Sequence, residues 1–570
     1  MGVEADLRRA LKARGFIPDD TVTTHRAYLG ELTTVGLKIP VRLDIVDPEF
    51  VTLPIITLLD RPGRLAEPLP HITQDNALCY LDARLSVLDP FDPLGMVGSC
   101  LKKAEDLLTE LVTGKSDADA VREFPTMWFP ESLALVDLPD GFTGKAEIQL
   151  FYSKAGEYRI IVAATTEAMR TAMAACGFDK ESKGPPLRVQ VYGLDKPLTA
   201  AGVSWPPRSA QDLCRWLRPS HPAVATAIEN DIVPSMKGDR GRAVILRAPN
   251  GMVGATFDVP KFLDTVEFRA RRKPVLRAFR QNEANWKLVR VSCLRMDRAY
   301  IYGRSLGDGM LTLEGKKILL VGCGNIGGFL AAQLAKVGAG SKGRLMLVDP
   351  DILLAENIGR HLLGLPAMLR YKAEACRDYL LQQMGAITVE AFAGDVRDLK
   401  NTLAGYDLII DATGEEAISL WLNQRRIEAV QAGKRFPPIL HLWLHGAGSA
   451  AVGFLNLAPE AACYKCLRPV YGGPWRYDPL KEDVAEKELV LQACGDGTHI
   501  RYPVSASGYA ASLGLEMAMD WCKGTPKPLL RSRQINRAVA RANFDSHPER
   551  HKDCLSCKHL LSSPIPSVPA

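Results

Sequence analysis

The pattern of hydrophobic and polar positions changes twice along the chain and divides it into three segments. In residues 1–120, an amphipathic helical run at Ala5–Arg14 comes first, and a second helical run at Val97–Val112 closes the segment. Three strand-like runs lie between them: His25–Thr33, Leu37–Ile45 and Val51–Leu59. Helix, antiparallel meander, extended loop and helix together predict an α+β domain.

Residues 121–295 alternate short apolar runs with loops that contain proline. Short runs bounded by proline and glycine are typical of strands, so this segment predicts a β-rich middle or linker domain. The predicted strands are Ala146–Tyr152, Tyr158–Ala164, Leu187–Tyr192 and Ala243–Leu246, with helices at Thr166–Cys176 and Ala210–Leu217.

Residues 296–570 alternate strand-like and helical runs. Lys317–Val321 is a nearly continuous apolar run, and a glycine-rich loop and a helical run follow it. Arg344–Val348 is the next strand-like run. This alternation predicts a doubly wound, Rossmann-like parallel sheet. We therefore expect a multidomain chain with both α/β and α+β parts.

Composition narrows the class of protein. The 570 residues are 47% hydrophobic and 24% charged, which is ordinary for a globular protein, and they exceed what one core accommodates. The net charge of +6 does not indicate direct nucleic-acid binding. The sequence contains no apolar run of about 18 residues and no signal peptide, so we expect no membrane span and a cytoplasmic location. The thirteen cysteines are then expected to be reduced.

The glycine-rich loop has the form of a nucleotide site. Gly322-x-Gly324-x-x-Gly327 follows a predicted strand and opens a predicted helix. Glycine allows a tight turn and lets the backbone approach a phosphate, and the helix N-terminus offers free N–H groups. Asp349 ends the next predicted strand, 25 residues after Gly324, near the usual spacing of a carboxylate that holds ribose hydroxyls.

ATP is favoured over a dinucleotide by three polar residues that follow Asp349 in the chain. Asn357 and Arg360 lie just past the second strand, and Lys372 is on the next helical run. Cationic groups there would neutralise a triphosphate and its leaving pyrophosphate. A dehydrogenase has no need for them, although a nicotinamide (NAD)-dependent oxidoreductase remains an alternative for the glycine loop.

Five cysteines near the C-terminus divide by spacing. Cys463/Cys466 and Cys554/Cys557 form two Cys-x-x-Cys pairs, whose four thiolates can close a tetrahedral structural Zn²⁺ site. Cys494 lies alone between the pairs in a polar loop, which gives a nucleophilic thiol the exposure that it needs.

In this order, the motifs resemble the ThiF/MoeB-type adenylation domain shared with ubiquitin-activating enzymes, over roughly residues 296–560. The resemblance implies ATP and Mg²⁺, with Asp349 holding ribose and Asn357, Arg360 and Lys372 holding phosphates.

The resemblance also covers residues outside the nucleotide motif. It includes the four paired cysteines as a zinc site and implies that Cys494 forms a thioester. It further implies that Arg304, upstream of the first strand, reaches into a partner subunit's site, and hence that the chain is a homodimer.

One departure from the family concerns the metal. The family usually has Asp-x-x-Asp-Asn after the fourth strand, and its second aspartate binds Mg²⁺. Here Asp411 is followed by Ala-Thr-Gly414-Glu415, so glycine stands at the metal position. Asp411 or Glu415 would have to take that role, and a catalytically inactive scaffold is the alternative that this departure leaves open.

The first segment resembles a ubiquitin-conjugating enzyme, in its element order and in the stretch Asn76-Ala-Leu-Cys79-Tyr-Leu. Where that family has His-Pro-Asn, this chain has Leu69-Pro70-His71, and His71 lies eight residues before Cys79. The resemblance implies that Cys79 carries an acyl group. His71 would either donate an N–H to the oxyanion or take a proton from the attacking amine.

Together the two resemblances predict a fused activating and conjugating enzyme, similar to those of bacterial anti-phage CBASS operons. A partner protein's C-terminal carboxylate would be adenylated, passed to Cys494 and then to Cys79, and joined to an amine of a target. The carboxylate donor would be a nucleotidyltransferase of the operon or a ubiquitin-like protein. The alternative within the family is a sulfur-carrier adenylyltransferase, which has no use for Cys79.

Overall fold

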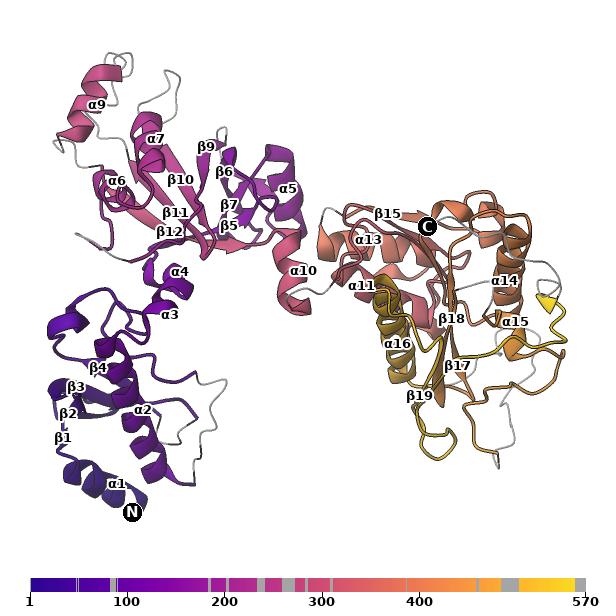
Figure 1. The fold of residues 1–570 in the computed structure, drawn as a ribbon, viewed down its shortest axis with the longest axis horizontal. Helices are drawn as coiled ribbons and strands as arrows, with labels where there is room; N and C mark the ends of the chain where they lie inside the picture. Colours follow the sequence, from indigo (N-terminus) through magenta and orange to yellow (C-terminus); the bar gives the residue numbers. More distant parts are fainter. Residues whose placement is uncertain are drawn as a thin grey trace. The chain divides into compact units, whose positions relative to one another are not determined.

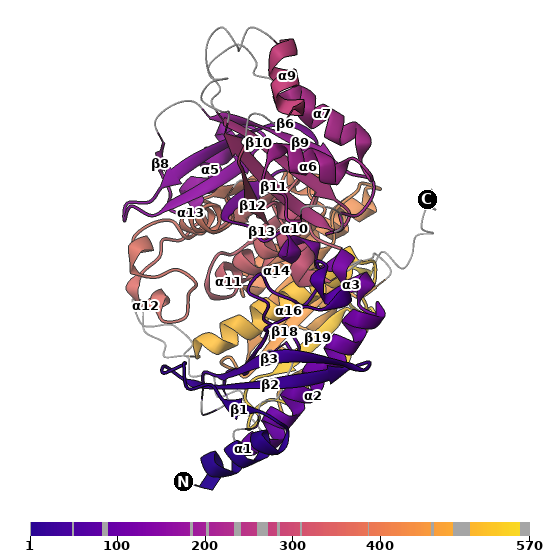
Figure 2. The ribbon, with the colours of Figure 1, turned by 90° about the vertical axis from the view of Figure 1, so that its left-hand side faces the viewer.

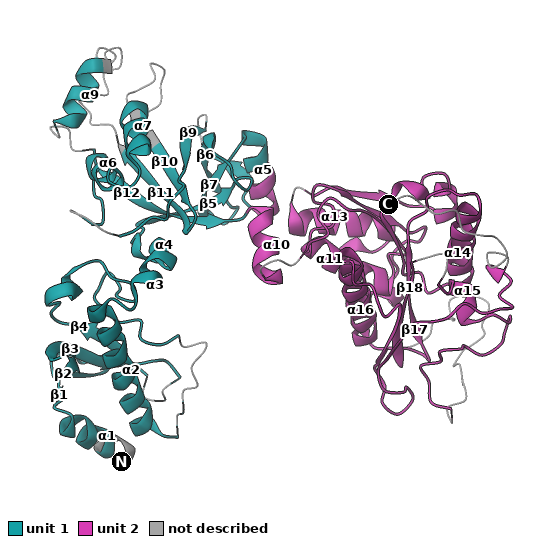
Figure 3. Cartoon of the chain, viewed as in Figure 1, with its two compact units in different colours: residues 1–169, 178–296 teal, residues 170–177, 297–570 magenta. Residues whose placement is uncertain are grey.

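The computed structural model divides the chain into two units (Figure 3). The first comprises residues 1–169 and 178–296, and the second comprises residues 170–177 and 297–570. None of the helices in the described part of the chain has the length and apolar character of a membrane span. The described residues are 2–47, 49, 51–82, 89, 91–182, 186–200, 205–232, 241–258, 272–281, 286–307, 311–385, 387–457, 461–482 and 502–558.

The first unit begins with an antiparallel four-stranded sheet in the order β1-β2-β3-β4 (Figures 1 and 2). Alternate residues of β3, Ile39, Val41 and Leu43, are fully buried and pack in one core with helix α2. This arrangement confirms the predicted α+β fold. The elements are α1 (Gly2–Ala13), β1 (Ile17–Pro18), β2 (Arg26–Thr34), β3 (Leu37–Ile45), β4 (Ile55–Leu58), η1 (Gly63–Ala66), α2 (Pro93–Thr113), α3 (Asp117–Arg122) and α4 (Phe124–Met127).

An eight-stranded mixed sheet forms the rest of the first unit. Its order is β7-β5-β12-β11-β10-β9-β6-β8, and an additional β6–β7 pairing closes the sheet on itself. The strands are β5 (Ser132–Asp137), β6 (Gly144–Tyr152), β7 (Tyr158–Ala163), β8 (Lys180–Glu181), β9 (Leu187–Gly193), β10 (Gly241–Ala248), β11 (Gly251–Asp258) and β12 (Leu288–Arg295). The intervening helices are α5 (Thr166–Ala175), whose residues from 170 onward belong to the second unit, α6 (Ala210–Leu217), α7 (Pro222–Ile232) and α9 (Arg272–Arg280).

The second unit contains the other eight-stranded sheet, in the order β15-β14-β13-β16-β17-β18-β19-β20. Its strands are β13 (Lys317–Val321), β14 (Arg344–Val348), β15 (Val389–Phe392), β16 (Leu408–Asp411), β17 (Ile439–His445), β18 (Ala450–Asn456), β19 (Leu530–Gln534) and β20 (Phe544–Ser546). The helices are α10 (Arg298–Leu306), α11 (Asn325–Lys336), α12 (Ala355–Ile358), η3 (Leu365–Ala367), α13 (Lys372–Met384), η4 (Val396–Leu399), η5 (Leu403–Gly405), α14 (Glu416–Gln431), α15 (Tyr464–Leu467) and α16 (Val504–Cys522).

The parallel half of this sheet, β13 to β17, has helices on both faces, as Figure 1 shows for α16 and α14. In β13, Ile318 and Leu320 belong to one hydrophobic core, and Leu319 and Val321 belong to the core on the opposite face. Burial on both faces explains the continuous apolar run in the sequence. The predicted doubly wound sheet is therefore confirmed, while β18 to β20 extend it in antiparallel fashion.

Candidate active site

The glycine loop joins the carboxyl end of β13 to α11. Gly322 has φ of +87°, and a Cβ there would lie 2.9 Å from the backbone of Thr413. A Cβ on Gly327 would lie 1.8 Å from the Gly322 carbonyl oxygen. Only glycine tolerates these approaches. No side chain caps α11 at Gly324, so its first backbone N–H groups are available for an anion.

A pocket of about 630 Å³ opens at the carboxyl ends of β13, β14 and β16, the edge where ligands bind in doubly wound sheets. Six residues predicted from the sequence line it: Gly322, Gly324, Asp349, Asn357, Arg360 and Lys372. Gly327 does not line the pocket, but it allows the tight turn of the glycine loop. Polar residues that line the pocket, but to which the sequence analysis gave no role in nucleotide binding, include Asn325, Asp351, Asp395, Thr413 and Tyr502.

Asp349 holds the glycine loop against the end of β14. Its carboxylate accepts hydrogen bonds from the backbone N–H of Cys323, at 2.7 Å, and of Asp351, at 2.8 Å. Burial raises the pKa of Asp349, and the two N–H donors and the nearby Lys372 oppose this only in part. Lys372 is buried and donates to the Asp351 carboxylate at 2.8 Å. The site therefore holds an ammonium group in place before any ligand binds.

His361 supports the loop from behind and was not singled out from the sequence. Its Nδ1 accepts a hydrogen bond from the backbone N–H of Leu363 at 3.0 Å, so Nε2 carries the proton and donates to the Cys323 carbonyl at 2.7 Å. Burial lowers the pKa of His361, which keeps the ring neutral. In the sequence, only its position directly after Arg360 pointed to a place near the nucleotide site.

Asp411 lies behind the pocket wall, where the sequence suggested a nucleotide or metal ligand. Its side chain is 1% exposed and accepts hydrogen bonds from Thr413 Oγ1, Ser419 Oγ and His441 Nδ1 at 2.7, 2.5 and 2.9 Å. Burial raises its pKa, but the hydrogen bonds and charge of these partners outweigh that effect, so the pKa lies below its ordinary value. The carboxylate is thus occupied in holding the loop that follows β16.

Glu415 is the acidic residue of that loop that lines the pocket. Gly414, at the family's metal position, has φ of +70°, a conformation that aspartate adopts only with strain. Burial and the carboxylates Asp351, Asp411 and Asp349 raise the pKa of Glu415. Among the described residues, the acidic side chains that line the pocket are thus Asp349, Asp351, Asp395 and Glu415, while Asp411 is not among them.

Two other expected residues lie away from the pocket or outside the described residues. Arg304 is on α10, with its guanidinium over the ring of Tyr300 at 5.9 Å, and it is absent from the described lining of the nucleotide pocket. Cys494 falls within residues 483–501, which are outside the described part of the chain.

The four paired cysteines come together in the second unit. Their sulfur atoms all lie within 4.8 Å of one another, and all four side chains are buried. Three S···S distances are 3.7, 3.7 and 3.4 Å, close to the edge of about 3.8 Å expected for a tetrahedron with Zn–S bonds of about 2.3 Å. The backbone N–H of His551 donates to Cys466 Sγ at 3.4 Å. The chemistry of this donor set fits Zn²⁺.

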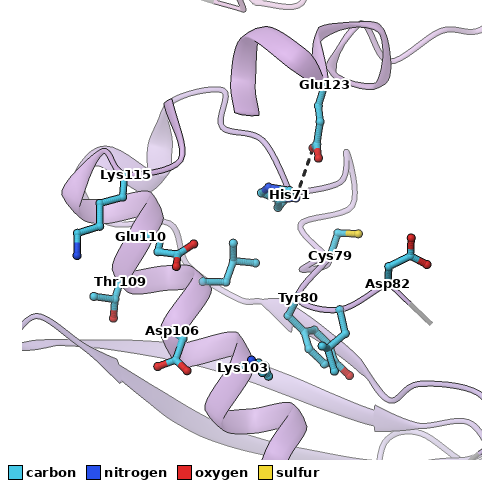
Figure 4. A pocket seen from close by; sticks show the side chains of 12 residues that line it. His71, Cys79, Tyr80, Asp82, Lys103, Asp106, Thr109, Glu110, Lys115 and Glu123 are labelled. Atoms are coloured by element: carbon cyan, nitrogen blue, oxygen red, sulfur yellow. Dashed lines mark ion pairs between the residues drawn. The ribbon is translucent and has the colours of Figure 1, made fainter. Parts of the chain in front are cut away.

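The candidate thiol of the first unit, Cys79, is exposed at the end of a loop that is tied to β4. The loop backbone pairs through Leu78 N–H with Ile56 O and through Cys79 N–H with His71 O, both at 2.8 Å. Cys79 lines a pocket of about 930 Å³ with His71, Glu123 and Asp82, while Asp106, Glu110 and Lys115 line its other side (Figure 4). The thiol is thus accessible and held by a defined backbone.

Acidic residues surround His71 and Cys79. Glu123 Oε2 lies 3.4 Å from His71 Nδ1, and Asp119 Oδ2 lies 3.6 Å from Nε2. Both ring nitrogens therefore face carboxylates. Loss of solvent around the sulfur, followed by the charges of Glu123 and Asp82, raises the pKa of the Cys79 thiol. His71 and Cys79 therefore share one acidic pocket.

Comparison with known proteins covers both halves of the chain. The ThiF family matches residues 297–555, and prokaryotic E2 family B matches residues 4–133. The molybdopterin-synthase adenylyltransferase of Escherichia coli K12 is 27% identical over 183 residues, which cover 31% of this chain and 69% of that protein. An adenylation-type domain and a conjugating-type domain thus lie in one chain, as the sequence predicted.

Two relatives match most of the length of this chain. The ATP-dependent ubiquitin transferase-like protein Cap2 of E. coli TW11681 is 26% identical over 473 residues, which cover 77% of this chain and 78% of that protein. Cap2 of Pseudomonas aeruginosa BWHPSA011 is 32% identical over 572 residues, which cover 97% of this chain and 98% of that protein. Because the identity to the P. aeruginosa protein extends over nearly the whole of both proteins, the chain belongs to the Cap2 family of ATP-dependent ubiquitin transferase-like proteins.

Proposed function

We propose that this chain uses ATP to activate the C-terminal carboxylate of a partner protein and conjugates it to an amine of a target. The observation that carries the proposal is the single pocket that gathers the glycine loop, Asp349, Asn357, Arg360 and Lys372. It provides a helix N-terminus and two cationic side chains for phosphates, beside a carboxylate for ribose. The exposed thiol of Cys79 in the first unit supports the conjugating half.

The chemistry proceeds by one adenylyl transfer followed by three acyl transfers. A carboxylate oxygen of the partner attacks the α-phosphorus of ATP, which forms an acyl adenylate and releases pyrophosphate. The thiolate of Cys494 attacks the acyl carbon, and AMP leaves. The thiolate of Cys79 displaces that of Cys494 by thioester exchange. The target amine attacks the second thioester, loses its proton, and forms an amide while the Cys79 thiolate leaves.

Mg²⁺ bound with ATP would supply charge neutralisation for the phosphates. The acidic side chains that line the pocket fit a divalent cation, and Glu415 is our proposed protein ligand because Asp411 is buried behind the wall. Arg360 and Lys372 are proposed to bind the phosphates that become pyrophosphate.

A structural Zn²⁺ is proposed for Cys463, Cys466, Cys554 and Cys557. The four buried sulfurs support this site, and a full set of thiolates leaves no open position for catalysis. The ion would tie the C-terminal segment to α15. Asn423 reinforces this connection, because its amide contacts the Tyr464 N–H at 2.9 Å and the Ser556 hydroxyl at 3.0 Å.

His71 is proposed to stabilise the oxyanion formed when an amine attacks the thioester on Cys79. Its place beside Cys79 in the same pocket supports that role, because a ring N–H there would donate to the oxyanion. The left-handed backbone of His71, with φ of +61°, is strained for a non-glycine residue, which is a feature common at functional sites.

The setting that we propose is a bacterial CBASS operon, in the cytoplasm. The partner carboxylate would belong to the operon's nucleotidyltransferase or to a ubiquitin-like protein. A homodimer in which Arg304 reaches the other subunit's nucleotide site is part of the proposal, as is a division into domains at residues 1–120, 121–295 and 296–570.

Pyrophosphate exchange and thioester trapping test the proposal. The wild-type chain with the operon's nucleotidyltransferase should exchange labelled pyrophosphate into ATP and form conjugates. Cys494→Ala should keep exchange but lose every thioester on a non-reducing gel. Cys79→Ala should retain one thioester and make no conjugate, while Cys176→Ala, which removes another exposed thiol, should match the wild type.

The outcomes separate the alternatives. Normal conjugation by Cys79→Ala would refute the conjugating role. A thiocarboxylate product would favour the sulfur-carrier activity, for which the similarity to molybdopterin-synthase adenylyltransferase is the supporting observation. Absence of exchange with the nucleotidyltransferase and with ubiquitin-like partners would favour the inactive scaffold, and NAD binding in its place would favour the oxidoreductase.

A further inference from the structure

Tyr502 touches two residues of the nucleotide pocket although it lies about 140 positions after the nearer of them in the chain. Its hydroxyl accepts a hydrogen bond from Asn325 Nδ2 at 2.9 Å, and Asn325 is the first residue of α11. The guanidinium of Arg360 lies over the Tyr502 ring, 5.5 Å from the ring centre. All three side chains line the pocket.

The tyrosine itself is held from behind by a tight turn. Gly448, with φ of +78°, lies between β17 and β18, and a Cβ added there would be 2.5 Å from the Cβ of Tyr502. The backbone of the turn thus packs directly against Tyr502, and Ala506 of α16 lies on the same side. The ring is a fixed surface rather than a loose side chain.

Arg360 has little else to orient it. Its Nε is buried and has no hydrogen-bond partner among the described residues, and no carboxylate pairs with it within that part of the chain. A guanidinium stacked on an aromatic ring keeps its in-plane N–H groups free for a phosphate. Stacking on the ring of Tyr502 therefore orients the Arg360 side chain toward the pocket.

We propose that Tyr502 is a positioning residue for ATP, which rests on the proposed adenylation function. Its ring holds Arg360 for the outer phosphates, and its hydroxyl holds Asn325 at the phosphate-binding end of α11. Tyr502 acts only through these two side chains. Its loss should therefore weaken the binding of ATP, which has outer phosphates, and spare AMP, which has none.

The test measures ATP and AMP binding to the full-length chain by isothermal titration calorimetry in Mg²⁺. Tyr502→Ala should weaken ATP binding about tenfold, since a desolvated cation–π contact is lost, and change AMP binding less than about twofold. Tyr502→Phe keeps the ring and should cost only about threefold. In the Arg360→Ala background, Tyr502→Ala should cost only about threefold, because the cation–π contact is already gone and only the Asn325 hydrogen bond remains to be lost.

Tyr509→Ala is the matched control, because Tyr509 lies on α16, is half exposed and is not among the pocket's lining residues. Thermal unfolding and circular dichroism identify any variant that fails to fold, and Tyr502→Phe keeps the test open in that case. The inference would be overturned if Tyr502→Ala left ATP binding unchanged, or if it weakened AMP binding as much as ATP binding. It would also be overturned if Tyr502→Ala weakened ATP binding by the full tenfold in the Arg360→Ala background. A folded wild-type chain that binds neither nucleotide would overturn the proposed function, and this inference with it.

Discussion

Replacing Asp411 with alanine is expected to destabilise the second unit by about 4 kcal/mol, through a network that lies beneath the nucleotide pocket. The carboxylate accepts hydrogen bonds from the backbone and side chain of Thr413, from Ser419 and from His441. Asp411 and His441 are each 1% exposed, so water does not replace a lost partner without rearrangement.

The magnitude follows from what remains after the substitution. Removing the carboxylate leaves the buried His441 Nδ1 without its hydrogen-bond partner, and an unpaired buried polar group costs about 1–3 kcal/mol. The hydroxyls of Thr413 and Ser419 add to that cost, and local relaxation offsets part of it. Asp411→Asn keeps an acceptor oxygen but loses the charge, so we expect it to cost about 2 kcal/mol.

Hydrogen exchange in urea is the appropriate assay, because a chain with two units does not give one well-defined unfolding transition. Exchange of the buried amides of β13 and β16 reports the opening of the second unit. Asp398→Asn, at an exposed position, is the control and should change stability by less than about 0.5 kcal/mol. If Asp411→Asn unfolds like the wild type yet loses ATP or Mg²⁺ binding, the carboxylate is a ligand and the reasoning is wrong.

Three other outcomes are expected. Because the pKa of Asp411 is lowered in the folded chain, its stabilising effect is present above the ordinary value of 3.8 and disappears as pH falls through the lowered value. The stability gap between wild type and Asp411→Asn should thus be constant from about pH 7 to 5 and close below about pH 4; a gap that widens in acid would contradict this. Elemental analysis should find about one zinc per chain in the wild type and much less in Cys466→Ser, and equal zinc in both would argue against the tetrad. Glu123→Gln should lower the pKa of Cys79 by removing a negative charge and raise its alkylation rate at neutral pH roughly two- to fivefold, measured by peptide mass spectrometry with Cys176 as the internal reference. An unchanged Cys79 rate would show that Glu123 does not act on the thiol.

Local patterns in the sequence were sufficient for several elements of the fold. The apolar run Lys317–Val321 was predicted as a strand of a parallel sheet, and the structure buries both of its faces. The glycine loop was predicted as a turn into a helix, because its glycines are needed for backbone geometry within a few residues. Strands β5, β11 and β12 were missed. β5 and β12 pair with each other across more than 150 positions, which no local pattern reveals.

By itself, the sequence determined the family resemblance, the nucleotide motif and the two cysteine pairs, since each depends on residue type and short spacing. Only the tertiary structure decided which side chains share a site. It buried Asp411 against His441, brought Tyr502 beneath Arg360, and set Glu123 beside His71. These contacts join residues 30 to more than 140 positions apart, and such proximity arises from strand order and helix packing, which no local pattern specifies.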